Sequence, residues 1–124
     1  MKFTDSITVD SSGRSSQASL FVDPSADYLK DHFPGAPTLP GLVMLEGAVR
    51  AAAALWEQGP RGQTATAVLE HVERLQMVRR VVPGETLLII ARMEPGVDER
   101  TRWFTARGTV EGESAMRARF RLKR

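Results

Sequence analysis

Apolar and polar positions alternate in several stretches of this chain, and that alternation predicts strands with one buried face. Turn residues such as Pro83-Gly84 and Pro95-Gly96 separate the alternating stretches. In the last stretch, apolar side chains from Met116 to Leu122 alternate with arginines and a lysine, which predicts one buried face and one basic, solvated face. Six strands are predicted, at residues 3–9, 16–22, 64–78, 86–93, 102–110 and 114–122.

Residues 42–56 break the alternation. Twelve of these fifteen residues are apolar, and four consecutive alanines at residues 51–54 favour a helix. A helix that is apolar on nearly every side must be buried on nearly every side. The pattern therefore predicts a single α+β domain over residues 1–124, in which an antiparallel sheet of about six strands wraps one long helix. A second copy of the chain can cover whatever helix surface the sheet leaves open.

The composition narrows the chemistry that this chain can perform. Its 124 residues include 17 Lys and Arg, 15 Asp and Glu, two His and no Cys. The lack of Cys excludes a disulfide framework, a thiolate metal site and a Cys nucleophile, and two His make a metal site an unexpected feature. The first residues lack the apolar stretch of a signal peptide, and Glu46 and Arg50 interrupt the longest apolar run. A cytoplasmic protein without a membrane span is expected.

Charge is divided unevenly along the chain. Residues 1–62 carry five basic and seven acidic side chains, whereas residues 63–124 carry twelve basic and eight acidic ones. A basic second half either faces an acidic partner or forms a solvated strand face. The chain has no nucleic-acid-binding motif and only eight aromatic residues for base stacking, so nucleic acid is not the expected partner.

The candidate chemistry lies in a loop and the helix that follows it. Three prolines in seven residues, from Pro34 to Pro40, stiffen the loop that carries His32. Glu46 lies on the apolar helix, where burial favours the neutral acid. The helix starts near Gly41, and its unpaired backbone N–H groups can polarise a carbonyl oxygen. A His, a carboxylic acid and a helix N-terminus together suit proton abstraction beside a carbonyl with loss of a hydroxyl.

Each of these residues also has a structural interpretation. His32 can brace the loop, and Glu46 can be the partner of Arg50, because residues four apart on a helix form ion pairs. His71, the second histidine, has no reactive neighbour in sequence and is expected to be structural or on the surface.

Two sequence segments resemble the FabZ-type 3-hydroxyacyl-acyl-carrier-protein dehydratases. Residues 32–41 read HFPGAPTLPG and contain every fixed position of the family's loop signature, and Glu46 follows His32 by fourteen residues, as in the family. Residues 79–85 read RRVVPGE and are similar to a second family segment with a basic residue and a Pro-Gly turn. With the order of elements, the resemblance covers most of the chain from about residue 16 onward.

The resemblance implies a hot-dog fold and a homodimer with shared active sites. His32 would remove a proton from C2 of the acyl chain, and Glu46 of the partner subunit would protonate the departing 3-hydroxyl. The Gly41 N–H would bind the thioester oxygen, and a backbone carbonyl near Thr38 would orient the His32 ring. The substrate would arrive on the phosphopantetheine arm of an acidic acyl carrier protein, with no metal and no dissociable cofactor.

Departures from the family pattern mark a divergent member. Asp31 replaces the usual Gly and favours protonated His32, and Arg50 replaces the usual Gln and favours ionised Glu46. These changes favour a specialised polyketide or lipid pathway. They leave two alternative functions open: a hot-dog thioesterase, or a non-catalytic subunit that pairs with an active relative. The resemblance is compatible with assembly of the dimer into a higher oligomer. Arg79 and Arg80 are the residues expected to receive the carrier protein.

Overall fold

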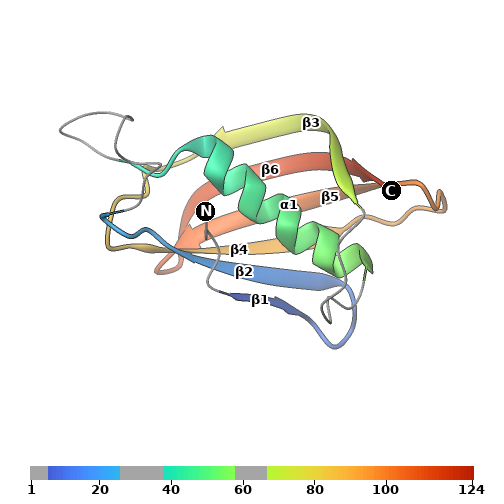
Figure 1. The fold of residues 1–124 in the computed structure, drawn as a ribbon, viewed down its shortest axis with the longest axis horizontal. Coiled ribbons are helices and arrows are strands. Elements are labelled where there is room, and N and C mark those ends of the chain that lie inside the picture. Colours follow the sequence, from blue (N-terminus) through green and yellow to red (C-terminus); the bar gives the residue numbers. More distant parts are fainter. Residues whose placement is uncertain (1–5, 26–37, 58–66) are drawn as a thin grey trace.

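A computed structural model describes residues 6–25, 38–57 and 67–124. One helix lies across one face of a six-stranded antiparallel sheet (Figure 1), and the strand order is β1-β2-β4-β5-β6-β3. This is the predicted hot-dog arrangement. The elements are β1 (Ser6–Val9), β2 (Ser15–Phe21), α1 (Gly41–Glu57), β3 (Val68–Met77), β4 (Thr86–Met93), β5 (Thr101–Val110) and β6 (Glu113–Lys123).

The six predicted strands and the helix are confirmed, with limits that differ by one to a few residues. Residues 3–5 and 64–66, which were predicted to be in strands, lie outside the described residues. The β1–β2 turn is closed by two backbone bonds, from Asp10 N–H to the Ser15 carbonyl and from Gly13 N–H to the Asp10 carbonyl. Gly13 has a φ of 73°, a conformation in which glycine carries no Cβ penalty.

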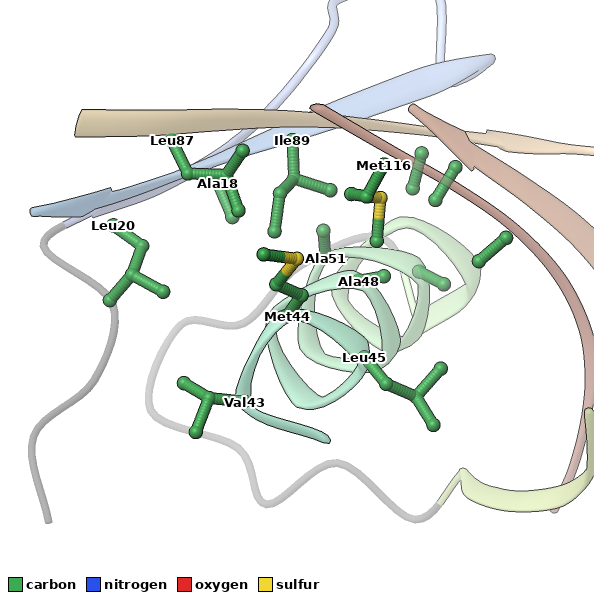
Figure 2. Close-up of a cluster of buried hydrophobic side chains, with 14 of the residues drawn as sticks. Ala18, Leu20, Val43, Met44, Leu45, Ala48, Ala51, Leu87, Ile89 and Met116 are labelled. Carbon is green, nitrogen blue, oxygen red and sulfur yellow. The ribbon is translucent and has the colours of Figure 1, made fainter. Parts of the chain in front are cut away.

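The core lies between α1 and the inner face of the sheet. Figure 2 shows Met44, Ala48 and Ala51 of the helix directed at Ile89 of β4 and Met116 of β6. Small helix residues allow close approach to the sheet. The Ser16 hydroxyl of β2, for example, donates a 2.6 Å hydrogen bond to the Ala51 carbonyl inside the helix.

Gly108 is the matching small residue on β5. A Cβ at this position would lie 2.6 Å from Met116 Cγ and 2.9 Å from a Leu87 methyl carbon, which is too close for any side chain. The inner face of the sheet is therefore packed to the point where a single added methyl group requires the neighbours to move.

The helix is less buried than its composition predicted. Leu42 is 76% exposed, and the Glu46 and Arg50 side chains are about half exposed, at 45% and 51%. These three residues are spaced four apart and form one stripe on the side away from the sheet. The prediction of burial on nearly every side is wrong for this stripe in the single chain. No helix in the described part of the chain is long and apolar enough to cross a membrane.

The outer face of the sheet is also less solvated than predicted near its β3 side. Arg119 pairs with Glu94 at 2.8 Å and also with Glu73, and Arg121 pairs with Glu70 at 2.6 Å. The guanidinium carbons of Arg119 and Arg121 lie 4.0 and 5.2 Å from the Trp103 ring centroid.

The prediction of a solvated basic face is therefore wrong for these two arginines. Charge pairing and stacking on an aromatic ring hold them in place instead. The pKa of Glu94 is lowered, because Arg119 donates hydrogen bonds to its carboxylate.

Candidate active site at the start of the central helix

The chain enters α1 through a short, tightly bonded segment. Leu39 donates its N–H to the Val81 carbonyl at 2.8 Å, and Thr38 beside it is buried. The Pro40 carbonyl accepts hydrogen bonds from the N–H groups of Val43 and Met44, at 3.0 and 3.2 Å. These bonds fix the direction in which the helix leaves the loop. His32 and Asp31, the two predicted site residues within the loop, lie outside the described residues.

Gly41 is the first residue of α1 and lies against the end of the edge strand β3. A Cβ here would lie 3.2 Å from the Met77 sulfur and 3.8 Å from a Leu75 methyl carbon, so a larger residue would push the helix start away from the strand. As the first helical residue, Gly41 has no acceptor for its N–H within the helix. The position fits the predicted role of the Gly41 N–H as a donor to a carbonyl oxygen, which stays a prediction.

Glu46 and Arg50 form the predicted i, i+4 ion pair. Arg50 Nη2 and Nε donate to Glu46 Oε2 at 2.8 and 3.2 Å. Within the described part of the chain, Oε1 accepts no hydrogen bond. The carboxylate is thus held by one oxygen on the exposed stripe of α1.

Exposed apolar residues lie at the start of this helix and at the end of β3 beside it, and the sequence pattern did not predict them. Leu42 lies on the helix, while Met77 at the end of β3 and Val78 just after it are 58% and 46% exposed. Almost every position of β3 is exposed, and β3 is a terminal strand of the sheet, so its outer backbone edge is unpaired among the described strands. The irregular spacing of apolar residues at 67–78 was the one sequence feature that could have indicated this exposed surface. A strand with one buried face alternates cleanly, whereas an edge strand at an interface has apolar residues on both faces.

Arg79, which was predicted to bind a carrier protein, forms ion pairs with nearby carboxylates of the same chain. Its guanidinium bonds Glu85 at 2.9 Å and lies 3.5 Å from Glu113. The other Glu85 oxygen accepts the Val82 N–H at 2.9 Å. The Val82 N–H and then Arg79 lower the pKa of Glu85, because both stabilise the charged carboxylate. Arg80, the second residue of this prediction, is exposed.

His71 lies on the exposed strand β3, and its ring meets the Trp103 ring edge-on with centroids 6.0 Å apart. The expectation of a structural or surface histidine is confirmed. Within the ranges that the structure describes, no group of three or more His, Asp or Glu side chains is arranged to hold a metal ion.

Comparison with known proteins gives one family match. The model of the ApeI-like family, described as ApeI dehydratase, matches residues 8–116. Similar curated proteins are dehydratases named 3-hydroxyacyl-acyl-carrier-protein dehydratase FabZ. The one from Polynucleobacter asymbioticus is 30% identical over 91 residues, and the one from Thermus thermophilus is 36% identical over 90 residues. These matches cover 73% and 69% of this chain but only 60% and 61% of the relatives' own lengths.

Solved structures share the fold. The dehydratase heterocomplex ApeI:P from Xenorhabdus doucetiae has a TM-score of 0.76 at 21% identity, with complete coverage of both chains. The Escherichia coli PaaI protein, from a phenylacetic acid degradation operon, has a TM-score of 0.71 at 18% identity and covers 95% of this chain and 82% of its own. One helix packed on a six-stranded antiparallel sheet is common to this chain and these structures.

Proposed function

Since this chain belongs to the ApeI-like dehydratase family of hot-dog proteins, we propose that it dehydrates (3R)-3-hydroxyacyl thioesters on an acyl carrier protein to trans-2-enoyl thioesters. The observation that carries the proposal is the placement of Glu46. Its carboxylate lies on the exposed stripe of α1, with Oε1 unbonded among the described residues, and the apolar end of β3 lies against the start of the same helix. The acyl chain of the substrate needs an apolar surface, and the reaction needs an acid–base group beside it.

The reaction removes one proton from C2 and a hydroxyl from C3, which leave as water while a C2–C3 double bond forms. His32 takes the C2 proton, and Glu46 of the partner subunit gives its own proton to the leaving hydroxyl through Oε1. His32 then releases its proton to solvent and Glu46 regains one from solvent, which restores both groups for the next turnover. The Gly41 N–H donates to the thioester oxygen, whose negative charge grows as the C2 proton leaves. The Thr38 carbonyl orients the His32 ring. These steps need neither a metal nor a dissociable cofactor.

A second hot-dog subunit completes this site. The unpaired edge of β3 offers backbone donors and acceptors to another strand, and the exposed Leu42, Met77 and Val78 supply apolar surface for a stable contact. Either a second copy or a related chain can fill this role, and the ApeI:P heterocomplex is a precedent for the latter among similar structures. A soluble, cytoplasmic complex that serves fatty-acid or specialised polyketide synthesis agrees with this assignment.

The carrier protein is expected to dock beside the turn at residues 79–85. Arg79 holds this turn through Glu85, and Arg80 is exposed next to it. An acidic carrier protein is attracted to these two cations. Charge reversal at Arg80 is therefore expected to slow turnover of the carrier-bound substrate more than that of a small thioester mimic.

The test is enoyl formation by the purified protein from a 3-hydroxyacyl thioester on a carrier protein. His32→Ala and Glu46→Gln are expected to abolish turnover, whereas Glu99→Gln, the same change at an exposed turn position, retains it. Absence of enoyl product from the unmodified protein, together with unchanged behaviour of His32→Ala, would refute the proposal. If product forms only after a related hot-dog chain is added, the chain is the partner subunit of an active relative.

The Glu46–Arg50 ion pair favours one alternative, thioester hydrolysis on the same fold. A carboxylate can activate a water molecule, and Arg50 holds the Glu46 carboxylate through two hydrogen bonds. Arg50→Gln distinguishes the two reactions, because it removes this contact and introduces the residue that the FabZ-type family usually has at this position. Faster dehydration in Arg50→Gln supports the proposed function, whereas release of free acid and thiol by the unmodified protein, reduced in Arg50→Gln, supports hydrolysis.

A further inference from the structure

The sheet face turned away from α1 carries a group of arginines that the proposed function does not use. Arg92 of β4, Arg107 of β5 and Arg117 of β6 are exposed and lie on three adjacent strands. Each alternates along its strand with buried residues that face the helix, so all three project from the opposite face. None of them pairs with a carboxylate in the part of the chain that the structure describes. We call this set the outer arginine cluster.

The cluster contains an unfavourable pairing. Arg107 and Arg117 are direct partners in the β5–β6 ladder, so their Cβ atoms stand on the same face, about 5 Å apart. Like charges in this position destabilise a sheet. In the neighbouring pair of the ladder, Thr105 opposes Arg119, and Glu94 and Glu73 neutralise that arginine. Among the described residues, the chain therefore supplies carboxylates to Arg119 and Arg121 of this face and leaves the adjacent Arg107–Arg117 pair without any.

A hollow of about 570 Å³ adjoins the cluster. Its lining is Ile90, Arg92, Thr105, Arg107 and Thr109. Two guanidinium groups and two hydroxyls can all donate hydrogen bonds here, no carboxylate is among the lining residues, and Ile90 adds an apolar contact. The volume falls within the range of small-molecule sites. A second hollow of about 290 Å³ is also lined by Ile90 and Arg92, but Asp10 is part of its lining. Because the Asp10 carboxylate repels anions, an anion is expected in the first hollow, on the side of Arg92 that faces Arg107.

We infer that the outer arginine cluster and its hollow bind a phosphorylated small molecule. Guanidinium forks match phosphate oxygens bidentately, and three adjacent cations favour a ligand with more than one negative charge. The bound phosphate neutralises the Arg107–Arg117 pair, and the organic part of the ligand contacts Ile90. A second copy of this chain is a poor occupant, because a twofold contact through this face would place the arginines of one copy against those of the other. The site is independent of the dehydration reaction.

Titration calorimetry of the full-length protein tests this inference, with inorganic diphosphate and adenosine triphosphate as probes. One diphosphate per chain is expected to bind, and adenosine triphosphate binds more tightly if Ile90 contributes. Arg107→Gln and Arg117→Gln are each expected to weaken binding by about ten-fold or more. Arg107→Lys retains the positive charge but lacks the paired N–H donors of the guanidinium, so it is expected to bind more tightly than Arg107→Gln and more weakly than the parent.

Arg100→Gln is the matched control, because it removes the same charge from an exposed position in the β4–β5 loop. It is expected to leave the affinity unchanged. Equal weakening by Arg100→Gln would mean a general charge effect and would overturn the inference, as would the absence of phosphate binding at physiological ionic strength. Arginine-dependent binding of polyglutamate, without binding of either phosphate probe, would also overturn it and identify this face as a surface for an acidic protein.

Discussion

The two sides of α1 differ in what they contribute to the protein. On the side that faces the sheet, Met44, Ala48 and Ala51 are fully buried and pack on Ile89 and Met116. On the opposite side, Leu42 is exposed, and Glu46 and Arg50 bond each other at the surface. The buried side consists of residues that gain free energy by leaving water. The exposed stripe carries the ion pair and an apolar residue, the composition of a site that a second subunit covers.

Folding and the proposed chemistry therefore depend on different residues of one helix. Substitutions on the sheet-facing side are expected to change stability, and substitutions in the stripe are expected to change turnover or assembly. Substitutions on the two sides of α1 can therefore separate effects on stability from effects on turnover or assembly.

The largest effect is expected from Glu46→Gln. If the proposed function is correct, loss of the proposed proton donor is expected to lower the rate of enoyl formation by about 100-fold or more. Because Glu46 is about half exposed and its partner Arg50 can turn to water, the free energy of unfolding changes by less than about 1 kcal/mol. Rate measurements and urea denaturation of the same preparation check both halves. A large loss of stability would mean that Glu46 serves the fold instead.

Met44→Ala is expected to show the opposite behaviour. Met44 is fully buried, so its truncation leaves a cavity and costs about 2–5 kcal/mol of unfolding free energy. Val97→Ala, at a position that is 98% exposed, serves as the control and should change stability by about 0.5 kcal/mol or less. Urea midpoints measure both. Equal stabilities of the two variants would contradict the assignment of the core.

Leu42→Glu tests the stripe as an interface. A charge placed at this exposed apolar position should leave the fold of the single chain intact but weaken association with a second subunit. Sedimentation velocity over a range of concentrations measures the shift towards monomer. Ser6→Glu, on the strand at the opposite edge of the sheet, is the control. Unchanged association of Leu42→Glu would place the interface elsewhere.

Glu85→Gln is expected to have a smaller, pH-dependent effect. The pKa of Glu85 in the folded chain lies below its ordinary value of 4.5, since the Val82 N–H and Arg79 stabilise the carboxylate. This stability is present above pH 4.5 and is lost as the pH falls through the folded-state value. The variant should be less stable than the parent by about 1 kcal/mol or less at pH 7, and the difference should vanish in acid. Thermal unfolding at pH 7 and at pH 3 measures this, and an equal difference at both would contradict it.

The smallest effect is expected from Arg117→Gln without added ligand. Removal of one of two directly opposed arginines relieves repulsion and raises the free energy of unfolding by about 0.2–1 kcal/mol. The gain should shrink at high salt, since screening already weakens the repulsion in the parent. A destabilised Arg117→Gln would show that Arg117 has a supporting contact.

Local pattern was enough to predict the secondary structure. The strand predicted at residues 86–93 matches β4 throughout, and Pro-Gly turns bound it on both sides. In β6, buried residues from Met116 to Leu122 alternate with arginines, because one buried face imposes a period of two on the sequence. The alanine run identified α1, since helix propensity acts within a few turns of chain. The loop signature and Glu46 indicated the family for the same reason, as their spacing is a property of adjacent residues.

The secondary-structure elements, the family and the candidate residues could all be predicted without a structure, because each depends on neighbours in the chain. Tertiary structure decided which side of α1 faces the sheet, so that Leu42 is exposed while Met44 is buried. It also brought Glu70, Glu73 and Glu94 to Arg121 and Arg119 across 25 to 51 residues, and left Arg107 facing Arg117. Strand order and register set these pairings, and both emerge only when distant segments compete for one core.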